Sequence, residues 1–229
     1  IVLARWHSAA TLFRPSEADR EWLTESAIAP SRTLRERCES IDFLASRLPD
    51  IERGITAETD AGFREVAVRV ALQFRRFHCQ TLNELSDWIE TAVPVQPCLR
   101  DVWHDHLLFS DDELTGLIDF GAVRTDTVAC DLSRLFGSLF SGSQLRWPEA
   151  LDAYESVRSL SVTERSLISP LHRSGLLLSG MTWLKRRYLH GSLGRISPAI
   201  IERLRFLADA VESLDADRDC RTDSGLILP

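Results

Sequence analysis

Lysine and glycine are scarce in this chain. Its 27 basic residues include a single lysine, Lys185. Only two glycines, Gly54 and Gly62, precede residue 101. A glycine-rich loop that covers nucleotide phosphates needs several close glycines, and a lysine on a nearby strand pairs with those phosphates. The first 100 residues therefore exclude a phosphate-binding loop of this kind.

Methionine, paired cysteines and long apolar runs are also missing. The single methionine is Met181 and the chain opens at Ile1, so we expect these 229 residues to be part of a longer protein. The five cysteines are odd in number, widely spaced and without a CxxC pattern, which predicts the reduced thiols of a cytoplasmic protein and argues against a disulfide framework or zinc knuckle. No apolar run approaches the roughly 20 residues that cross a membrane.

The net charge of the chain indicates which kind of molecule it binds. The formal charge is −7 at pH 7, which argues against a nucleic-acid-binding protein and favours attraction of a small cationic molecule. A length of 229 residues with 44% hydrophobic residues permits one large domain or two small ones with an ordinary core.

Helical periodicity dominates most of the sequence. Pro49 and Asp50 are expected to end one helix, and another is expected to break near Gln80 and Thr81. Two prolines at positions 94 and 97 predict an extended segment before residue 101. The expected fold class is α+β and mainly α. Apolar residues at helical spacing predict helices over 1–13, 33–48, 60–90, 132–140, 161–189 and 198–214.

Two apolar runs flank a polar turn in the middle of the chain. Residues 106–109 and 114–118 lie on either side of 110–113, the pattern of a short β-hairpin. Paired residues of a hairpin have a constant sum of numbers, here about 223 to 225, so His106 falls opposite residues 117 to 119. Asp119 is therefore expected beside His106, with Asp101 one loop away. Two carboxylates placed in this way could serve a metal-phosphate site.

The segment from Asp101 to Asp119 resembles the signature of the aminoglycoside phosphotransferase and choline kinase family. The family pattern is approximately H-G-D, then an N five residues later, and then I-D-F-G. Residues 99–101 (LRD) stand at the first triplet, residues 118–121 (IDFG) match the last element, and the offset of 18 between the two aspartates is that of the family. Asp131 resembles a structural aspartate that precedes a helix in the family.

Two positions depart from this pattern. Leu99 occupies the place of the histidine before the catalytic aspartate, and His106 occupies the place of the metal-binding asparagine. Imidazole nitrogen suits Zn²⁺ or Mn²⁺ better than it suits Mg²⁺.

The resemblance implies a protein-kinase-like C-terminal lobe over residues 1–214, followed by a polar tail over 215–229. The N-terminal nucleotide lobe is expected to lie outside the chain, which would be inactive without it. The implied reaction moves the γ-phosphate of ATP to a hydroxyl of a small cationic or sugar-like acceptor. Asp101 would be the catalytic base, and Asp119 with His106 would hold Mg²⁺, with Mn²⁺ as an alternative. Neither a nucleic acid nor a membrane is an expected partner.

Other interpretations remain open at this point. A degenerate kinase-like lobe could bind a ligand or protein without transferring phosphate. A metal-dependent hydrolase could use Asp101, Asp119 and a pair of histidines, His104 and His106, which would share a face if they lay on a strand. Asp105 is a second candidate for the catalytic aspartate, although its offset to Asp119 does not match the family.

Overall fold

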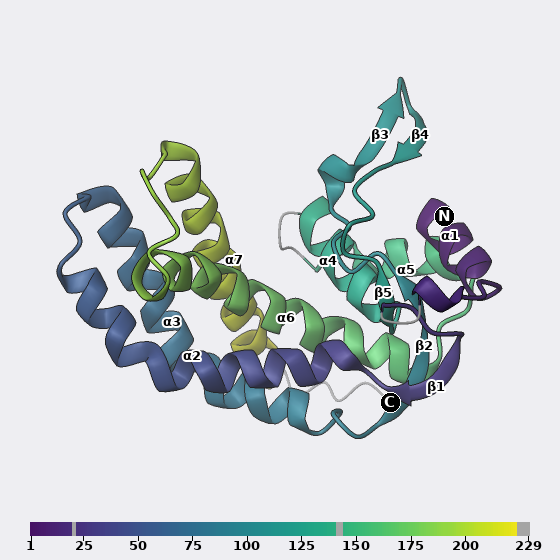
Figure 1. Cartoon of the computed structure of the whole chain (residues 1–229), viewed down its shortest axis with the longest axis horizontal. Helices are drawn as coiled ribbons and strands as arrows, with labels where there is room; N and C mark the ends of the chain where they lie inside the picture. Colours follow the sequence, from purple (N-terminus) through teal and green to yellow (C-terminus); the bar gives the residue numbers. More distant parts are fainter. Residues whose placement is uncertain (20–21, 141–143, 224–229) are drawn as a thin grey trace. The chain divides into compact units, whose positions relative to one another are not determined.

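A computed structural model describes residues 1–19, 22–140 and 144–223, with side chains up to residue 214 (Figure 1). The chain is mainly helical with two small antiparallel sheets, which confirms the expected α+β, mainly α class. Within these described residues, no helix is both long and apolar enough to cross a membrane.

The chain divides into two compact units, each built from two separate segments. The first unit comprises Ile1–Arg35 and Leu85–His172, and the second comprises Glu36–Glu84 and Arg173–Pro229. Every residue that the sequence singles out for chemistry belongs to the first unit.

The first unit contains a three-stranded antiparallel sheet in the order β1-β2-β5. Its strands are β1 (Ala27–Pro30), β2 (Ala92–Cys98) and β5 (Arg124–Asp126), and its helices are α1 (Val2–Ala10), α4 (Ala129–Leu139) and α5 (Trp147–Glu155). The expected extended segment is confirmed as β2, which is the central strand although it contains two prolines. Pro94 lies opposite Ile28 of β1, and Pro97 lies opposite Thr125 of β5. Each partner strand therefore pairs with a different half of β2.

The predicted hairpin is formed by β3 (Leu107–Ser110) and β4 (Glu113–Leu117). Leu107 pairs with Leu117 and Ser110 pairs with Glu113, so the register agrees with the predicted constant sum. The turn residue Asp111 has a φ of 53°, a left-handed conformation that aspartate tolerates in short hairpin turns. In Figure 1 the hairpin projects away from the helices of its own unit.

Buried side chains begin the long helices of the first unit. The carboxylate of Asp126 accepts hydrogen bonds from the hydroxyls of Ser31 and Thr33 and from the Thr33 amide. It thereby pairs a backbone N–H group in the first turn of α2 (Arg32–Thr56) that has no partner within the helix. A capping box opens α6 (Val162–Leu184), and its sequence Ser161-Val162-Thr163-Glu164 is the usual pattern of this motif. Ser161 donates its amide to Glu164, and the Glu164 amide donates to the Ser161 hydroxyl.

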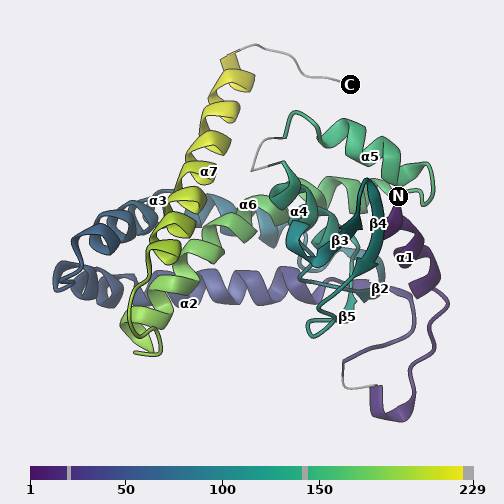
Figure 2. The ribbon, with the colours of Figure 1, turned by 90° about the horizontal axis from the view of Figure 1, so that it is seen from above.

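The second unit is a helical assembly without strands in its described residues. It contains the later part of α2, the helix α3 (Ala61–Ser86), the later part of α6 and the helix α7 (Pro198–Asp223). Figure 2 shows α7 running steeply across α3 and α6. The unit packs around fully buried apolar side chains, among them Ile41, Ile51, Phe63, Phe74, Met181, Leu184 and Leu204.

In the second unit, a buried carboxylate links the loop between α2 and α3 to the turn that follows α6. Glu58, whose side chain is 2% exposed, accepts hydrogen bonds from Arg187 Nε at 2.9 Å and Arg187 Nη2 at 3.1 Å. Arg187 belongs to a π-helical turn, Lys185–Leu189, that follows α6. This hydrogen bonding holds the pKa of Glu58 below its usual value. Tyr188 of the same turn packs on Gly54, where an added Cβ would lie 2.5 Å from the ring.

Three expected helix boundaries are wrong. Pro49 lies inside α2, because Ile41, Leu44, Leu48, Ile51 and Ile55 continue one buried face across it and outweigh the lost backbone bond. The α3 helix is not broken near Gln80 and Thr81, since Thr81 is itself buried on a face that continues to Leu85. The last helix extends beyond Leu214 to Asp223, so the first part of the expected tail 215–229 is helical. Residues 224–229 lie outside the described residues.

Candidate functional site

The loop after β2 carries the candidate catalytic residue. Leu99 is 2% exposed and anchors the loop in the core of the first unit. Arg100 has a φ of 64°, a left-handed conformation that favours glycine and strains other residues. Asp101, whose side chain is 54% exposed, follows directly. The loop thus places a solvent-accessible carboxylate beside a buried anchor and a strained residue.

Asp131, in the first turn of α4, holds this loop by its backbone. Its Oδ2 accepts the Leu99 amide at 2.8 Å, and its Oδ1 accepts the Arg100 amide at 2.6 Å. The Asp131 side chain is completely buried. These two amides precede Asp101, so Asp131 determines the path of the chain into the candidate catalytic residue.

Two further side chains contact this buried carboxylate network. The imidazole of His7, in α1, lies with Nε2 2.9 Å from Asp131 Oδ2 and with Nδ1 2.8 Å from the hydroxyl of Tyr154, in α5. Burial raises the pKa of Tyr154, so its hydroxyl keeps its proton at neutral pH. The imidazole next to the loop therefore comes from α1, whereas Leu99 occupies the loop position at which the family pattern has histidine.

Arg134 orients the candidate catalytic carboxylate. It lies on α4, and its Nε donates a hydrogen bond of 3.1 Å to Asp101 Oδ1. The Nη2 nitrogen lies 3.1 Å from the same oxygen. Both groups are accessible to solvent, so this ion pair contributes little to the stability of the fold and acts mainly on orientation.

His106 and Asp119 lie side by side, as predicted from the hairpin. The Ile118 amide donates to the His106 carbonyl at 3.1 Å, which extends the hairpin by one pair. His106 Nε2 lies 3.7 Å from Asp119 Oδ2. Asp119, 61% exposed, has a φ of 65° in the bend that follows β4.

The indole of Trp103 occupies one ring nitrogen of His106. Trp103 Nε1 donates a hydrogen bond of 2.6 Å to His106 Nε2, so this nitrogen acts as an acceptor. His106 Nδ1 is buried and has no hydrogen-bond partner among the described residues.

The pair of donor atoms fits a divalent cation. Ligand atoms about 2.1 Å from one ion lie roughly 3 to 4 Å apart, which matches the separation of His106 Nε2 from Asp119 Oδ2. Within the part of the chain that the structure describes, one group of three potential ligands gathers closely, namely His7, Cys98 and Asp131. This group is buried, and hydrogen bonds already engage each of its members. A metal there would have to displace the contacts that hold the loop.

The alternative of a histidine pair on one strand does not agree with the structure. His104, Asp105 and His106 form a single 3₁₀ turn before β3, so His104 and His106 do not share the face of a strand. His104 Nε2 lies 3.1 Å from Asp105 Oδ1, and both side chains are exposed. The two residues therefore pair with each other and not with His106.

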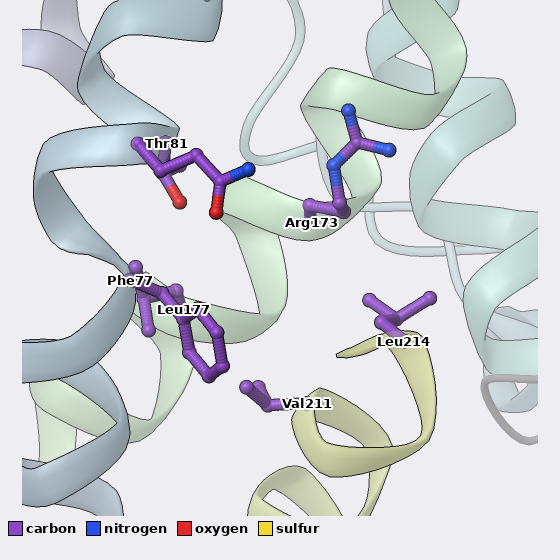
Figure 3. Close-up of a pocket in the computed structure, with 7 residues that line it drawn as sticks. Phe77, Thr81, Arg173, Leu177, Val211 and Leu214 are labelled. Atoms are coloured by element: carbon purple, nitrogen blue, oxygen red, sulfur yellow. The ribbon is translucent and has the colours of Figure 1, made fainter. Parts of the chain in front are cut away.

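Surface hollows open among the described residues of the second unit. One, of about 380 Å³ and open to solvent, is mostly apolar, and the Arg173 guanidinium at its edge points away from the Phe77 ring (Figure 3). Arg173 pairs with Glu84 at 2.8 Å. The residues that line this hollow belong to α3, α6 and α7, and none of them is a candidate for catalysis. They are Phe77, Gln80, Thr81, Arg173, Leu177, Val211 and Leu214.

Another hollow has a more polar wall. It is an open groove of about 890 Å³ whose lining includes the carboxylates Glu36 and Glu39 of α2. The ammonium of Lys185 lies 5.0 Å from the ring centre of Phe43 at its edge. The lining therefore combines two carboxylates with one ammonium, and that ammonium already covers the Phe43 ring.

Sequence reasoning missed Arg134, His7 and Tyr154. Arg134 could have been found, because it lies one helical turn after Asp131 in a helix predicted from its apolar face. No sequence signal points to His7 or Tyr154, which lie 124 positions before and 23 positions after Asp131. The structure brings Asp119 to His106 and brings Asp131 to the loop of Asp101.

Comparisons with known proteins agree with the motif. The model of the phosphotransferase enzyme family, abbreviated APH, matches residues 1–166. No curated protein matches the chain. Among solved structures, a glucosamine kinase in crystal form B is 14% identical with a TM-score of 0.35, and the match covers 95% of this chain and 47% of that chain. A glucosamine kinase in complex with glucosamine, ADP and inorganic phosphate is 13% identical with a TM-score of 0.35, over 95% of this chain and 46% of that one.

The chain thus spans about half the length of the glucosamine kinases that it matches. The family model covers most of the chain, from α1 into the start of α6, and includes the loop of Asp101, the hairpin and Asp131. On this match, the chain belongs to the phosphotransferase enzyme family.

Proposed function

We propose that residues 1–214 are the C-terminal lobe of an ATP-dependent phosphotransferase, which moves the γ-phosphate to a hydroxyl of a small cationic or sugar-like acceptor. The observation that carries this proposal is the buried Asp131, which holds the loop of Asp101 through two backbone amides. The family match over residues 1–166 supports the reaction class. The polar tail from residue 215 has no role in this proposal.

Asp101 is the proposed catalytic base. Its carboxylate is exposed enough to meet an acceptor hydroxyl, and Arg134 holds its Oδ1 atom. Phosphate transfer depends mainly on positioning the hydroxyl in line with the γ-phosphate and on accepting its proton as the new bond forms. The two amides bound by Asp131 keep the carboxylate in place for this role, against the backbone strain at Arg100.

Asp119 and His106 are the proposed ligands of Mg²⁺, with Mn²⁺ as an alternative. When bound, the ion would neutralise charge on the β- and γ-phosphates. The carboxylate of Asp119 is a hard oxygen donor, and His106 Nε2, 3.7 Å from it, carries the lone pair that accepts the Trp103 indole. His106 must release the Trp103 indole before that lone pair can bind metal.

The charge of the chain supports a cationic acceptor, whereas the sugar-like alternative rests on the family resemblance. The formal charge is −7, and the groove lined by Glu36 and Glu39 adds local negative charge in the second unit. Which acceptor is used does not follow from the fold.

Replacement of Asp101 by Asn tests the proposal in the full-length protein. We expect kcat to fall by roughly two to four orders of magnitude with little change in nucleotide affinity, because the amide cannot accept the proton. Asp105→Asn is the matched control, since it makes the same change four residues away and should leave kcat within about threefold. Unchanged turnover in Asp101→Asn together with a large loss in Asp105→Asn would transfer the role to Asp105.

A non-catalytic binding module is the second candidate. Leu99 in place of the family's histidine, and the Trp103 contact with the proposed metal ligand His106, favour it. The 229 residues hold no glycine-rich loop before Asp101, so we expect this chain by itself to bind ATP weakly and to be inactive. Calorimetric titration with ATP and Mg²⁺ would contradict this expectation by giving a low-micromolar dissociation constant. Phosphate transfer by the full-length protein would exclude the binding module.

A further inference from the structure

A buried row of hydrogen bonds leads from α5 through α1 to the loop of Asp101. We propose that His7 and Tyr154 are positioning residues for phosphate transfer, which act through Asp131 on the backbone of that loop. The inference rests on the proposed role of Asp101. Neither residue belongs to the sequence motif, and neither contacts Asp101.

Hydrogen bonds connect each member of this row to the next. The Asp131 carboxylate accepts two backbone amides, and His7 Nε2 donates to it at 2.9 Å. His7 Nδ1 and the Tyr154 hydroxyl share the next hydrogen bond, at 2.8 Å. The Arg158 guanidinium in turn donates to the Tyr154 oxygen. Each residue therefore fixes the orientation of the next.

Hydrogen bonds from neighbouring side chains also hold this row in place. Arg158 Nη2 donates to Glu164 at 2.8 Å and to Gln96 Oε1 at 3.1 Å. The amide of Gln96 donates to the backbone carbonyl of His7 at 2.7 Å. His7 is thus bound at both ring nitrogens and at its carbonyl oxygen, and its side chain is completely buried. A group so fully bonded has one orientation, which suits a positioning role.

The loop needs such support because its backbone is strained. Arg100 has a φ of 64°, which costs a residue with a side chain about 1 to 2 kcal/mol. Both bonds from Asp131 go to the amides of Leu99 and Arg100, which lie directly before the strained φ of Arg100. When Asp131 loses its partner His7, its carboxylate can rotate, and the loop can relax away from the geometry that Asp101 requires.

Tyr154→Phe is the sharpest test because it removes one oxygen atom and keeps the ring. The other tyrosine of the chain, Tyr188, gives a matched control, since its hydroxyl also bonds a buried side chain, Glu58 at 3.4 Å, but lies in the second unit. In Tyr154→Phe we expect amide hydrogen exchange at Leu99 and Arg100 to accelerate about tenfold or more, as measured by NMR. Exchange in the β3 and β4 strands should stay unchanged.

In the full-length protein, Tyr154→Phe should lower kcat about 10-fold while the KM values for ATP and acceptor stay within about twofold, because only the loop geometry is disturbed. Tyr188→Phe should change neither kcat nor exchange at Leu99 and Arg100. His7→Asn, a second variant, shortens the link to Asp131 and should act in the same direction with a larger effect. It replaces Tyr154→Phe as the test if that protein does not fold.

Unchanged exchange at Leu99 and Arg100 in the folded variant would overturn the inference, as would an equal loss of kcat in Tyr188→Phe. The exchange measurement needs no turnover, so it stands even if Asp101 is not the base. Conversely, full activity of Asp101→Asn would refute the proposed function and leave the exchange result unaffected. The two failures are therefore distinguishable.

Discussion

Arg134 and Asp101 meet on a single oxygen atom. The Nε and Nη2 nitrogens of Arg134 both lie 3.1 Å from Asp101 Oδ1, so the guanidinium contacts one edge of the carboxylate. In the proposed function, Oδ2 is the oxygen that Arg134 leaves for the acceptor proton. The ion pair is exposed, so its main effect is the direction of the carboxylate.

Arg134→Ala should therefore separate activity from stability. We expect kcat of the full-length protein to fall about 10- to 100-fold, because Asp101 loses its fixed orientation. The free energy of unfolding should change by less than about 1 kcal/mol, as for other exposed ion pairs. Steady-state kinetics and urea denaturation measure the two quantities. Arg146→Ala breaks another exposed pair in the same unit, with Glu149, and should leave kcat unchanged. Equal kinetics in both variants would contradict the orienting role.

His106→Asn should preserve or improve activity with Mg²⁺ and reduce any preference for Mn²⁺. The amide oxygen is a harder donor than imidazole, and the change also removes the acceptor of the Trp103 hydrogen bond. Phosphate transfer is measured over a range of Mg²⁺ and Mn²⁺ concentrations. Trp103→Phe is the companion variant, because it frees His106 Nε2 without changing the ligand set and should increase apparent Mn²⁺ affinity. An identical metal preference in all three proteins would leave Asp119 as the protein's ligand.

Arg100 offers a test of backbone strain. Arg100→Gly and Arg100→Ala remove the same side-chain contacts, but only glycine adopts a φ of 64° without steric penalty. The glycine variant should be more stable than the alanine variant by about 1 kcal/mol. Thermal and urea unfolding measure the stability of both proteins. An alanine variant at least as stable as the glycine variant would mean that residue 100 is not strained in solution.

Leu99→His restores the residue of the family pattern, yet it should destabilise the protein. Leu99 is almost completely buried, and a buried imidazole without a partner costs about 1 to 3 kcal/mol. Leu99→Met, which keeps the volume and apolar character, should cost less than about 1.5 kcal/mol. Urea denaturation compares the three proteins. A Leu99→His protein as stable as the parent would show that the core provides a hydrogen-bond partner for the ring.

Glu58→Gln should reveal a pH-dependent contribution to stability. Hydrogen bonds from Arg187 lower the pKa of Glu58 in the folded state, so its contribution is present above the unfolded value of about 4.3 and is lost as pH falls through the lower folded value. The variant should be less stable by about 2 kcal/mol at pH 7, and the difference should shrink below about pH 4. Glu65→Gln is the control, because Glu65 is exposed and lies 3.9 Å from Arg205. A difference that does not depend on pH would exclude the charged pair as the cause.

The sequence predicts features that depend on neighbouring residues. The hairpin register follows from a two-residue turn, so the positions of His106 and Asp119 could be derived without any structure. The capping box at Ser161 is equally local. The family resemblance identified Asp131 as a structural aspartate, but its contact with the Leu99 amide, 32 positions away, was not predicted.

The features that escaped prediction depend on distant packing. Pro49 was expected to end a helix, but a buried face on both sides of it keeps α2 continuous. Arg187 belongs to a basic run that is typical of a solvated helix face, whereas in the fold it binds a buried glutamate 129 positions away. His7 is one of six histidines, and nothing in its neighbourhood distinguishes it. Such contacts depend on the three-dimensional fold and produce no periodic pattern in the sequence.

The buried row from Tyr154 through His7 to Asp131 also constrains how this protein can diverge. Residue 7 must offer a proton to Asp131 on one side and a hydrogen-bond partner to residue 154 on the other. A change at position 7 or 154 alone leaves a buried polar atom without its partner. Among relatives that keep Asp131, substitutions at 7 and 154 should therefore be inherited together, although 147 positions separate them.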